Sequence, residues 1–102
     1  MGKDAPFTIG TLRLKLHVPA SGSLKDKRQV IRSLKDTLHN KFNVSVAEIG
    51  EQDKWQLAEL GVAVCGGDQA HLSEVLNHLL NLVRGFPMAM LTVYEMEFFA
   101  AG

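Results

Sequence analysis

One stretch of this chain, Ser23 to Phe42, constrains the fold most strongly. Its sequence, SLKDKRQVIRSLKDTLHNKF, is amphipathic with the period of an α-helix. Ser23 is a favourable N-cap residue, and Asp26 three positions later has the spacing of a capping box. At about 100° per residue, one sector of the helical wheel collects the apolar side chains Val30, Ile31, Leu34, Leu38 and Phe42. The stretch therefore predicts a helix that begins at Ser23 and packs one face on a core.

A row of cations fills the sector beside this apolar face. Its members follow helical steps of three and four: Lys25, Arg28, Arg32, Lys35 and His39. Lys27 also lies in the first turns, where the helix dipole disfavours cations by roughly 0.3–1 kcal/mol each. Two interpretations are open. Either solvent screens these charges and Lys27 extends its stem over the edge of the core, or the cations and the free amides of the first turn bind an anion such as phosphate.

The distribution of charge along the chain also favours an anionic partner. The formal net charge is zero, but residues 13–41 carry eight Lys and Arg against two Asp. Residues 42–102 carry two Lys and Arg against eight Asp and Glu. Such an asymmetry indicates contact with an anion, for example nucleic acid, unless folding interleaves the two halves and dilutes it.

Length and composition fit one globular domain over residues 1–102, with residues 1–6 as a flexible end. The chain has 46% hydrophobic residues, enough for a core, and no stretch approaches the ~20 apolar residues of a membrane span. Its beginning lacks the features of a signal peptide. The single cysteine, Cys65, cannot form an internal disulfide, and its apolar neighbours indicate a buried thiol. We therefore expect a cytoplasmic protein without membrane contact.

Alternating apolar and polar residues predict four strands around two helices. The strands are expected at Phe7–Val18, Asn43–Ile49, Leu57–Cys65 and Met88–Phe99, and a second helix between the cap residue Asp68 and the stop signals Gly85 and Pro87. This order is that of a ferredoxin-like α+β fold, βαββαβ, with a four-stranded antiparallel sheet and two helices on one face. The predicted core consists of Leu12, Leu14, Leu16, Ile31, Leu34, Leu38, Val44, Val46, Leu60, Val62, Val64, Leu72, Leu76 and Leu79.

The other face of this sheet would be uncovered. The first strand would place Arg13, Lys15 and His17 there, beside small residues of the third strand, Gly61 and Ala63. The last strand is apolar on both sides, so its alternation does not decide which side faces the core. A basic sheet face and a cationic helix flank are thus the two candidate binding surfaces.

Three segments carry a resemblance to a known family. SLKDKR at 23–28, FNVSVAE at 42–48 and AELGVAV at 58–64 resemble the YlxP-like family of small bacterial proteins of unknown function, and the likeness spans nearly the whole chain. The resemblance implies a ferredoxin-like fold. It also implies a ribosomal context, because genes of this family typically lie among those for translation initiation and ribosome maturation. It brings no catalytic residues.

The residues themselves favour a binding protein over an enzyme. No phosphate-binding glycine loop of the GxxxxGK[ST] type occurs, and His71 and His78 have no third metal ligand, so no cofactor or metal is expected. Glu48 and Glu59 lie on neighbouring strands, but nothing separates their pKa values for acid–base work. The first and third strands lack the stacking aromatic residues of an RNA-recognition motif.

We therefore expect a non-enzymatic RNA- or ribosome-associated binding protein. Its phosphate contacts are assigned to Lys25, Lys27, Arg28, Arg32, Lys35, Arg13, Lys15 and His17. Trp55 and Tyr94 are candidate partner contacts, although Trp55 would also serve to cover the core at a sheet end.

Two alternatives stay open. The uncovered sheet face could form a homodimer, with close approach at Gly61 and Ala63 and apolar area from Tyr94, Met96 and Phe98. Alternatively, the Ser21–Arg28 turn could be the pocket of an enzyme or binder of a phosphorylated small molecule.

Overall fold

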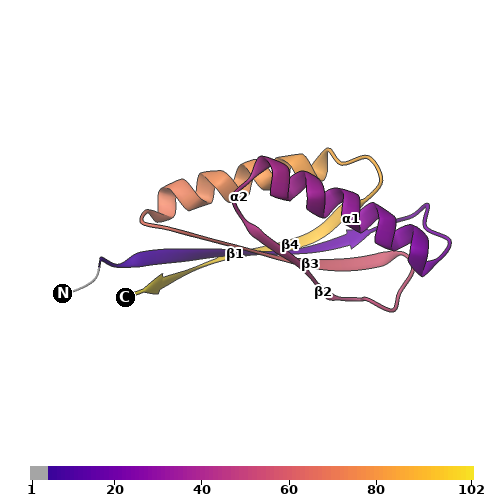
Figure 1. Cartoon of the computed structure of the whole chain (residues 1–102), viewed down its shortest axis with the longest axis horizontal. Coiled ribbons are helices and arrows are strands. Elements are labelled where there is room, and N and C mark those ends of the chain that lie inside the picture. Colours follow the sequence, from indigo (N-terminus) through magenta and orange to yellow (C-terminus); the bar gives the residue numbers. More distant parts are fainter. Residues whose placement is uncertain (1–4) are drawn as a thin grey trace.

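Four strands and two helices make up the described part of the chain. The computed structural model describes residues 5–102, so residues 1–4 of the expected flexible end lie outside it. The elements are β1 (Phe7–His17), α1 (Leu24–Lys41), β2 (Ser45–Gly50), β3 (Leu57–Gly66), α2 (Gln69–Arg84) and β4 (Met90–Ala101). The strands form one antiparallel sheet in the order β2-β3-β1-β4. Both helices lie on the same side of this sheet, and no element of residues 5–102 covers its other side, which we call the bare side (Figure 1). The expected ferredoxin-like fold is confirmed.

Helix α1 begins and ends where the sequence predicts. Ser23 is its N-cap, and the Ser23 hydroxyl accepts a hydrogen bond from the Asp26 amide at 3.1 Å. The Asp26 carboxylate accepts one from the Gly22 amide at 3.2 Å, so the two side chains fix the entry into the helix from both directions. Phe42 closes the other end through its amide, which donates to the carbonyl of Leu38.

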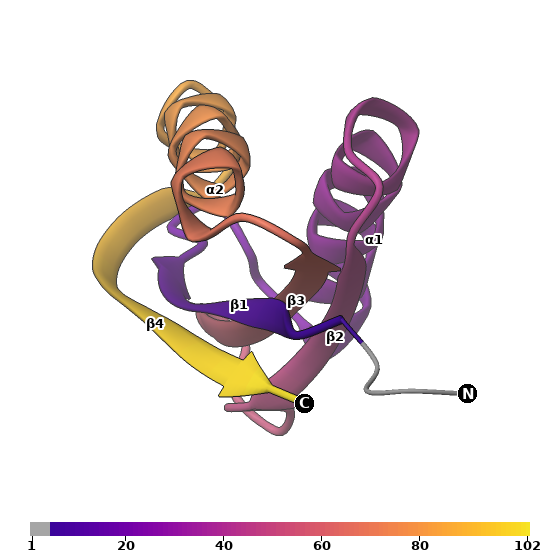
Figure 2. The same ribbon diagram turned by 90° about the vertical axis from the view of Figure 1, so that its left-hand side faces the viewer.

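The core lies between the two helices and the sheet. The helices run side by side over the strands (Figure 2), with α1 packed on β2 and α2 packed on β1, β3 and β4. Twelve of the fourteen predicted core residues are buried, and the other two, Val44 and Val64, are partly buried against the same cluster. Val44 precedes the first residue of the edge strand β2, where packing covers only one side.

A β-bulge explains why the alternation in β4 was ambiguous. The register pairs Lys15 with Val93 but Leu16 with Leu91, so β4 has one extra residue opposite that step of β1. As a result, the core-facing residues of β4 change from odd to even sequence numbers after the bulge: Leu91 packs on the core before it, and Met96 and Phe98 do so after it. The Thr92 hydroxyl donates to the Lys15 carbonyl at the bulge, at 3.1 Å.

Two expectations about single residues are wrong. Cys65 is exposed and not a buried thiol, because it alternates with Val62 and Val64 and points to the bare side of the sheet. Trp55 is 56% exposed in the β2–β3 connection and does not cover the core. No helix in residues 5–102 is both long enough and apolar enough to span a membrane.

Candidate functional site

Four cations form a stripe along the outer surface of α1. We use the name cation stripe for Lys25, Arg28, Arg32 and Lys35, of which the first three are exposed and Lys35 is half-buried. Within residues 5–102, no acidic side chain lies within 4.0 Å of any of these four charged groups. At 1.5 Å per residue, the stripe spans about 15 Å of a rigid helix. These positive charges are therefore open to a partner.

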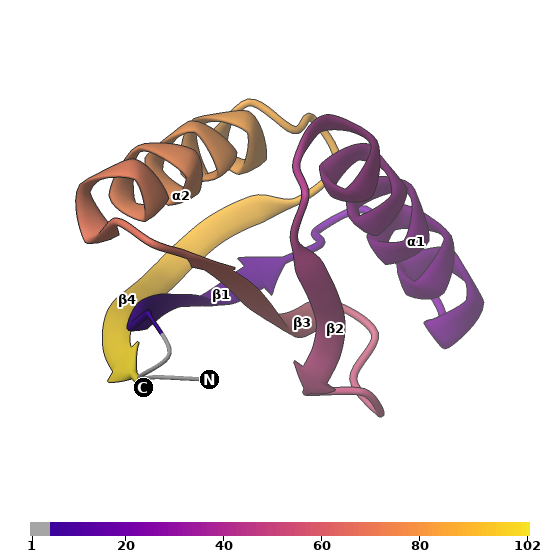
Figure 3. The ribbon, with the colours of Figure 1, turned by 60° about the vertical axis from the view of Figure 1, so that its left-hand side comes forward.

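The cation stripe lies on the flank of α1 that faces away from α2. The opposite flank is identified by an apolar cleft of about 370 Å³, in which Asp26, Gln29 and Val30 of α1 meet Pro87 and Met88 of the α2–β4 connection. Figure 3 shows α1 and α2 at opposite sides of the molecule, so the side of α1 away from α2 is an outer edge. A long anionic partner can approach this edge without meeting the second helix.

Lys27 is not part of this surface, and its assignment to the anion contacts is wrong. Its side chain is fully buried, and its ammonium donates to the carbonyl of Glu51 at 2.6 Å and to that of Leu57 at 3.0 Å. Its ammonium also lies 3.4 Å from the Glu48 carboxylate. Lys27 therefore ties α1 to the β2–β3 hairpin. The helical wheel contained this signal, because Lys27 is seven residues before Leu34 and falls in the same buried sector.

The bare sheet face is not the basic surface that the first strand suggests. Sheet pairing places acids around Arg13: its guanidinium donates to the Glu59 carboxylate at 2.5 Å and lies 3.8 Å from that of Glu95. The hydrogen bond and charge of Glu59, followed by the charges of Glu95 and Glu97, raise the pKa of Arg13 above its ordinary value. Arg13 is thus permanently charged but already paired, which leaves little of its charge for a phosphate.

The other residues assigned to this face differ in their exposure and in their charged neighbours. Lys15 is exposed and has no acidic group within ion-pair distance in the described chain, and His17 is half-buried at the end of β1. Glu48 and Glu59, weighed as an acid–base pair, point to opposite faces of the sheet: Glu48 contacts Lys27 under α1, and Glu59 contacts Arg13. They do not form a common site.

The N-terminal turn of α1 is occupied by the chain's own groups. The Asp26 carboxylate bonds the Gly22 amide, and the buried Ser21 hydroxyl donates to the Ser23 carbonyl at 2.9 Å. A carboxylate in this position repels a second anion. This arrangement argues against a phosphate pocket at the Ser21–Arg28 turn.

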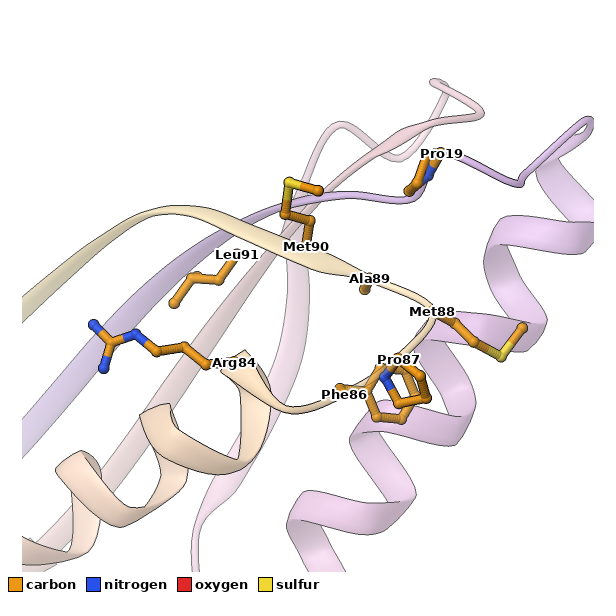
Figure 4. A pocket seen from close by; sticks show the side chains of 8 residues that line it. All are labelled: Pro19, Arg84, Phe86, Pro87, Met88, Ala89, Met90 and Leu91. Carbon is orange, nitrogen blue, oxygen red and sulfur yellow. The ribbon is translucent and has the colours of Figure 1, made fainter.

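A hollow of about 290 Å³ surrounds the α2–β4 connection (Figure 4), with Arg84 and Leu91 at one end and Met88 at the other. Among the described residues that line it, Arg84 alone is charged, and its guanidinium carbon lies 5.4 Å from the centre of the Tyr94 ring. Tyr94 therefore faces the helix side of the sheet and is engaged by α2. The hollow offers no nucleophile or general base.

The architecture defines a small ferredoxin-like α+β domain with one cationic helix flank and one bare sheet face. A family described as "Protein of unknown function (DUF503)" matches residues 9–96. The chain belongs to this family, and the expected membership in a YlxP-like family is confirmed. It is similar to the "Uncharacterized protein YlxP" of Bacillus subtilis (strain 168), with 34% identity over 91 residues, which are 89% of this chain and 99% of that protein.

A solved structure supports the fold from a different direction. The "De novo designed protein Foldit4" matches with a TM-score of 0.50 and 11% identity, over 94% of this chain and 97% of the designed one. At that identity, the likeness concerns the fold alone.

Proposed function

We propose that this protein is a cytoplasmic, non-enzymatic RNA- or ribosome-associated binding protein that contacts phosphates through the cation stripe of α1. The observation that carries the proposal is the row Lys25, Arg28, Arg32 and Lys35 on one helix flank, with no acidic partner among residues 5–102. Cations in the first turns of a helix oppose its dipole. Their presence there is accounted for by a partner that supplies negative charge.

The geometry of α1 supports a polyanion over a small anion. The stripe extends over about 15 Å, which is too long for a single phosphate group to contact all of it. The helix N-terminus itself is closed by the Asp26 carboxylate. Phosphate contacts set position and affinity without reading sequence. At the centre of the sheet, Arg13 and Gly61 stand opposite each other where an RNA-recognition motif would stack bases. We therefore propose recognition by shape and charge, in the ribosomal context that the family resemblance implies.

Affinity purification from the native cytoplasm tests this proposal. The tagged wild-type chain is expected to recover ribosomal RNA and ribosomal proteins, and the Arg28→Ala, Arg32→Ala double variant to recover much less of both. The matched control is Lys54→Ala with Arg84→Ala, which removes the same charge outside α1. Equal recovery of ribosomal RNA by the wild type and the α1 variant would contradict the role of the cation stripe.

A further inference from the structure

We propose that the bare face of the sheet binds a second copy of this chain. This open sheet face lies opposite the helices, so the inference is independent of the cation stripe. It is formed by alternate residues of the four strands: Phe7, Ile9, Thr11, Arg13 and Lys15 of β1, Ala47 and Ile49 of β2, Leu57, Glu59, Gly61, Ala63 and Cys65 of β3, and Val93, Glu95, Glu97 and Phe99 of β4.

Both ends of the open sheet face expose large apolar side chains. At one end, Phe7 is 43% and Phe99 is 48% exposed. At the other end, Leu57 is 40% and Val93 is 51% exposed. Clusters of exposed apolar side chains on a sheet without a covering layer are typical of an interaction surface. The dimer considered from the sequence used Met96 and Phe98 as apolar area on this face, but both pack on the core. In the structure, Phe99 and Val93 supply the apolar area of β4 on this face.

The middle of the face is a trough lined in part by small residues. Its volume is about 430 Å³, and its lining includes Ala47, Gly61 and Ala63 together with Ile49, Phe99 and the charged residues Arg13, Glu95 and Glu97. Gly61 cannot be enlarged without displacing a neighbour, because a Cβ atom there would lie 3.2 Å from the Ile49 side chain. The trough has room for side chains that project from a second sheet packed about 10 Å away.

The open sheet face carries both positive and negative side chains, so the charges of one copy can pair with those of a second copy. This charge distribution favours a second copy over nucleic acid. Arg13 and Lys15 are outnumbered by Glu59, Glu95 and Glu97, so the face repels phosphates. Lys15 has no acidic partner and Glu97 no basic partner within the described chain.

The positions of these two charges suit a two-fold axis. Lys15 lies two positions to one side of Arg13, and Glu97 pairs with Thr11, two positions to the other side. A two-fold axis between the two sheets, passing over Arg13 and perpendicular to the strands, places Lys15 of each copy over Thr11 of the other, beside Glu97 on the neighbouring strand. It also places the Phe99 end of each copy on the Val93 end of its partner.

The area of the face is sufficient for a stable dimer. The strands have 11, 6, 10 and 12 residues, and at about 3.3 Å per residue and about 4.8 Å between strands they give roughly 600 Å² per copy. Two such faces bury about 1,200 Å² in total, above the ~1,000 Å² expected of a specific interface.

Cys65 provides a test on the unmodified chain, because it is the single cysteine and it lies exposed on this face. Light scattering over a concentration series should give twice the mass of the chain at high micromolar concentration. The rate of Cys65 alkylation should fall several-fold over the same range. Phe99→Asp should stay monomeric with a constant rate, whereas the control Met88→Asp, an exposed apolar position outside this face, should behave as the wild type.

Charge exchange tests the dimer without touching apolar packing. Lys15→Glu should weaken association, and adding Glu97→Lys should restore it. A wild type that stays monomeric, a dimer whose Cys65 reacts at an unchanged rate, or a Phe99→Asp variant that dimerises normally would each overturn the proposal. Loss of RNA binding by Phe99→Asp without loss of a dimer would assign the face to nucleic acid and overturn it as well.

Discussion

The ammonium of Lys27 lies 2.6 Å from the carbonyl oxygen of Glu51, a residue with the left-handed backbone angle φ of 61°. The same ammonium bonds the carbonyl of Leu57, so a single buried cation fixes both ends of the β2–β3 connection under α1. Positive φ is costly for a residue with a side chain. The hydrogen bond from Lys27 therefore stabilises a turn that its own sequence disfavours.

Replacing Lys27 by methionine keeps the apolar stem and removes the charge. The variant leaves two carbonyl groups without their donor and the Glu48 carboxylate without its cation, so we expect the free energy of unfolding to fall by about 3 kcal/mol. Urea denaturation measures this loss. The control is Lys25→Met on the exposed flank, with an expected change within about 0.5 kcal/mol. Equal stability of the two variants would show that the buried cation contributes nothing.

Truncation of core residues tests the packing of the two helices. Leu34 of α1 and Leu76 of α2 are both 0% exposed, and replacing either by alanine should lower the free energy of unfolding by ~2–5 kcal/mol. Met88→Ala, at a position 53% exposed and outside the open sheet face, is the control and should cost clearly less. Thermal and urea unfolding give the comparison. A nearly silent Leu34→Ala or Leu76→Ala change would contradict the packing described for that helix.

The two cationic regions of the sequence should differ in their effect on RNA binding. Arg13 is paired with Glu59 and Glu95, whereas Arg28 has no acidic partner in the described part of the chain. We therefore expect Arg13→Ala to leave the affinity for ribosomal RNA nearly unchanged and Arg28→Ala to lower it several-fold. Fluorescence anisotropy at one fixed salt concentration compares them. A larger loss for Arg13→Ala would assign RNA contact to the sheet.

The sequence predicted the fold well where one periodic pattern dominated. In α1, apolar spacing and the Ser23 cap fixed both ends and the buried face. In β3, the alternation of Leu60, Val62 and Val64 implies an outward Cys65. The opposite expectation rested on the apolar neighbours of Cys65 in the sequence and not on its position in the alternation. In β4, a bulge opposite Lys15 and Leu16 of β1 shifts the register of pairing. The local alternation of apolar and polar residues in β4 does not reveal such a shift.

The candidate site was less predictable because charge pairing depends on tertiary contacts. The residues that surround Arg13 come from β3 and β4, 46 positions away in the case of Glu59, so the strand alone looked basic. The assignment of Lys27 to the phosphate contacts fails because lysine is rarely buried in general, whereas this lysine lies among the leucines of the buried sector of the helical wheel. The cation stripe was visible in the sequence because all its members lie on one helix and need no partner from elsewhere.

The salt dependence of RNA binding tests the central claim most directly. Ribosomal RNA fragments would be titrated at several salt concentrations with the wild type, with Arg28→Ala plus Arg32→Ala, and with the control Lys54→Ala plus Arg84→Ala. Each lost phosphate contact should flatten the slope of log affinity against log salt by about 0.7–0.9. We expect the α1 variant to bind more weakly with a slope flatter by roughly twice that amount, and the control to follow the wild type. Equal affinity and equal slope for the wild type and the α1 variant would contradict the account.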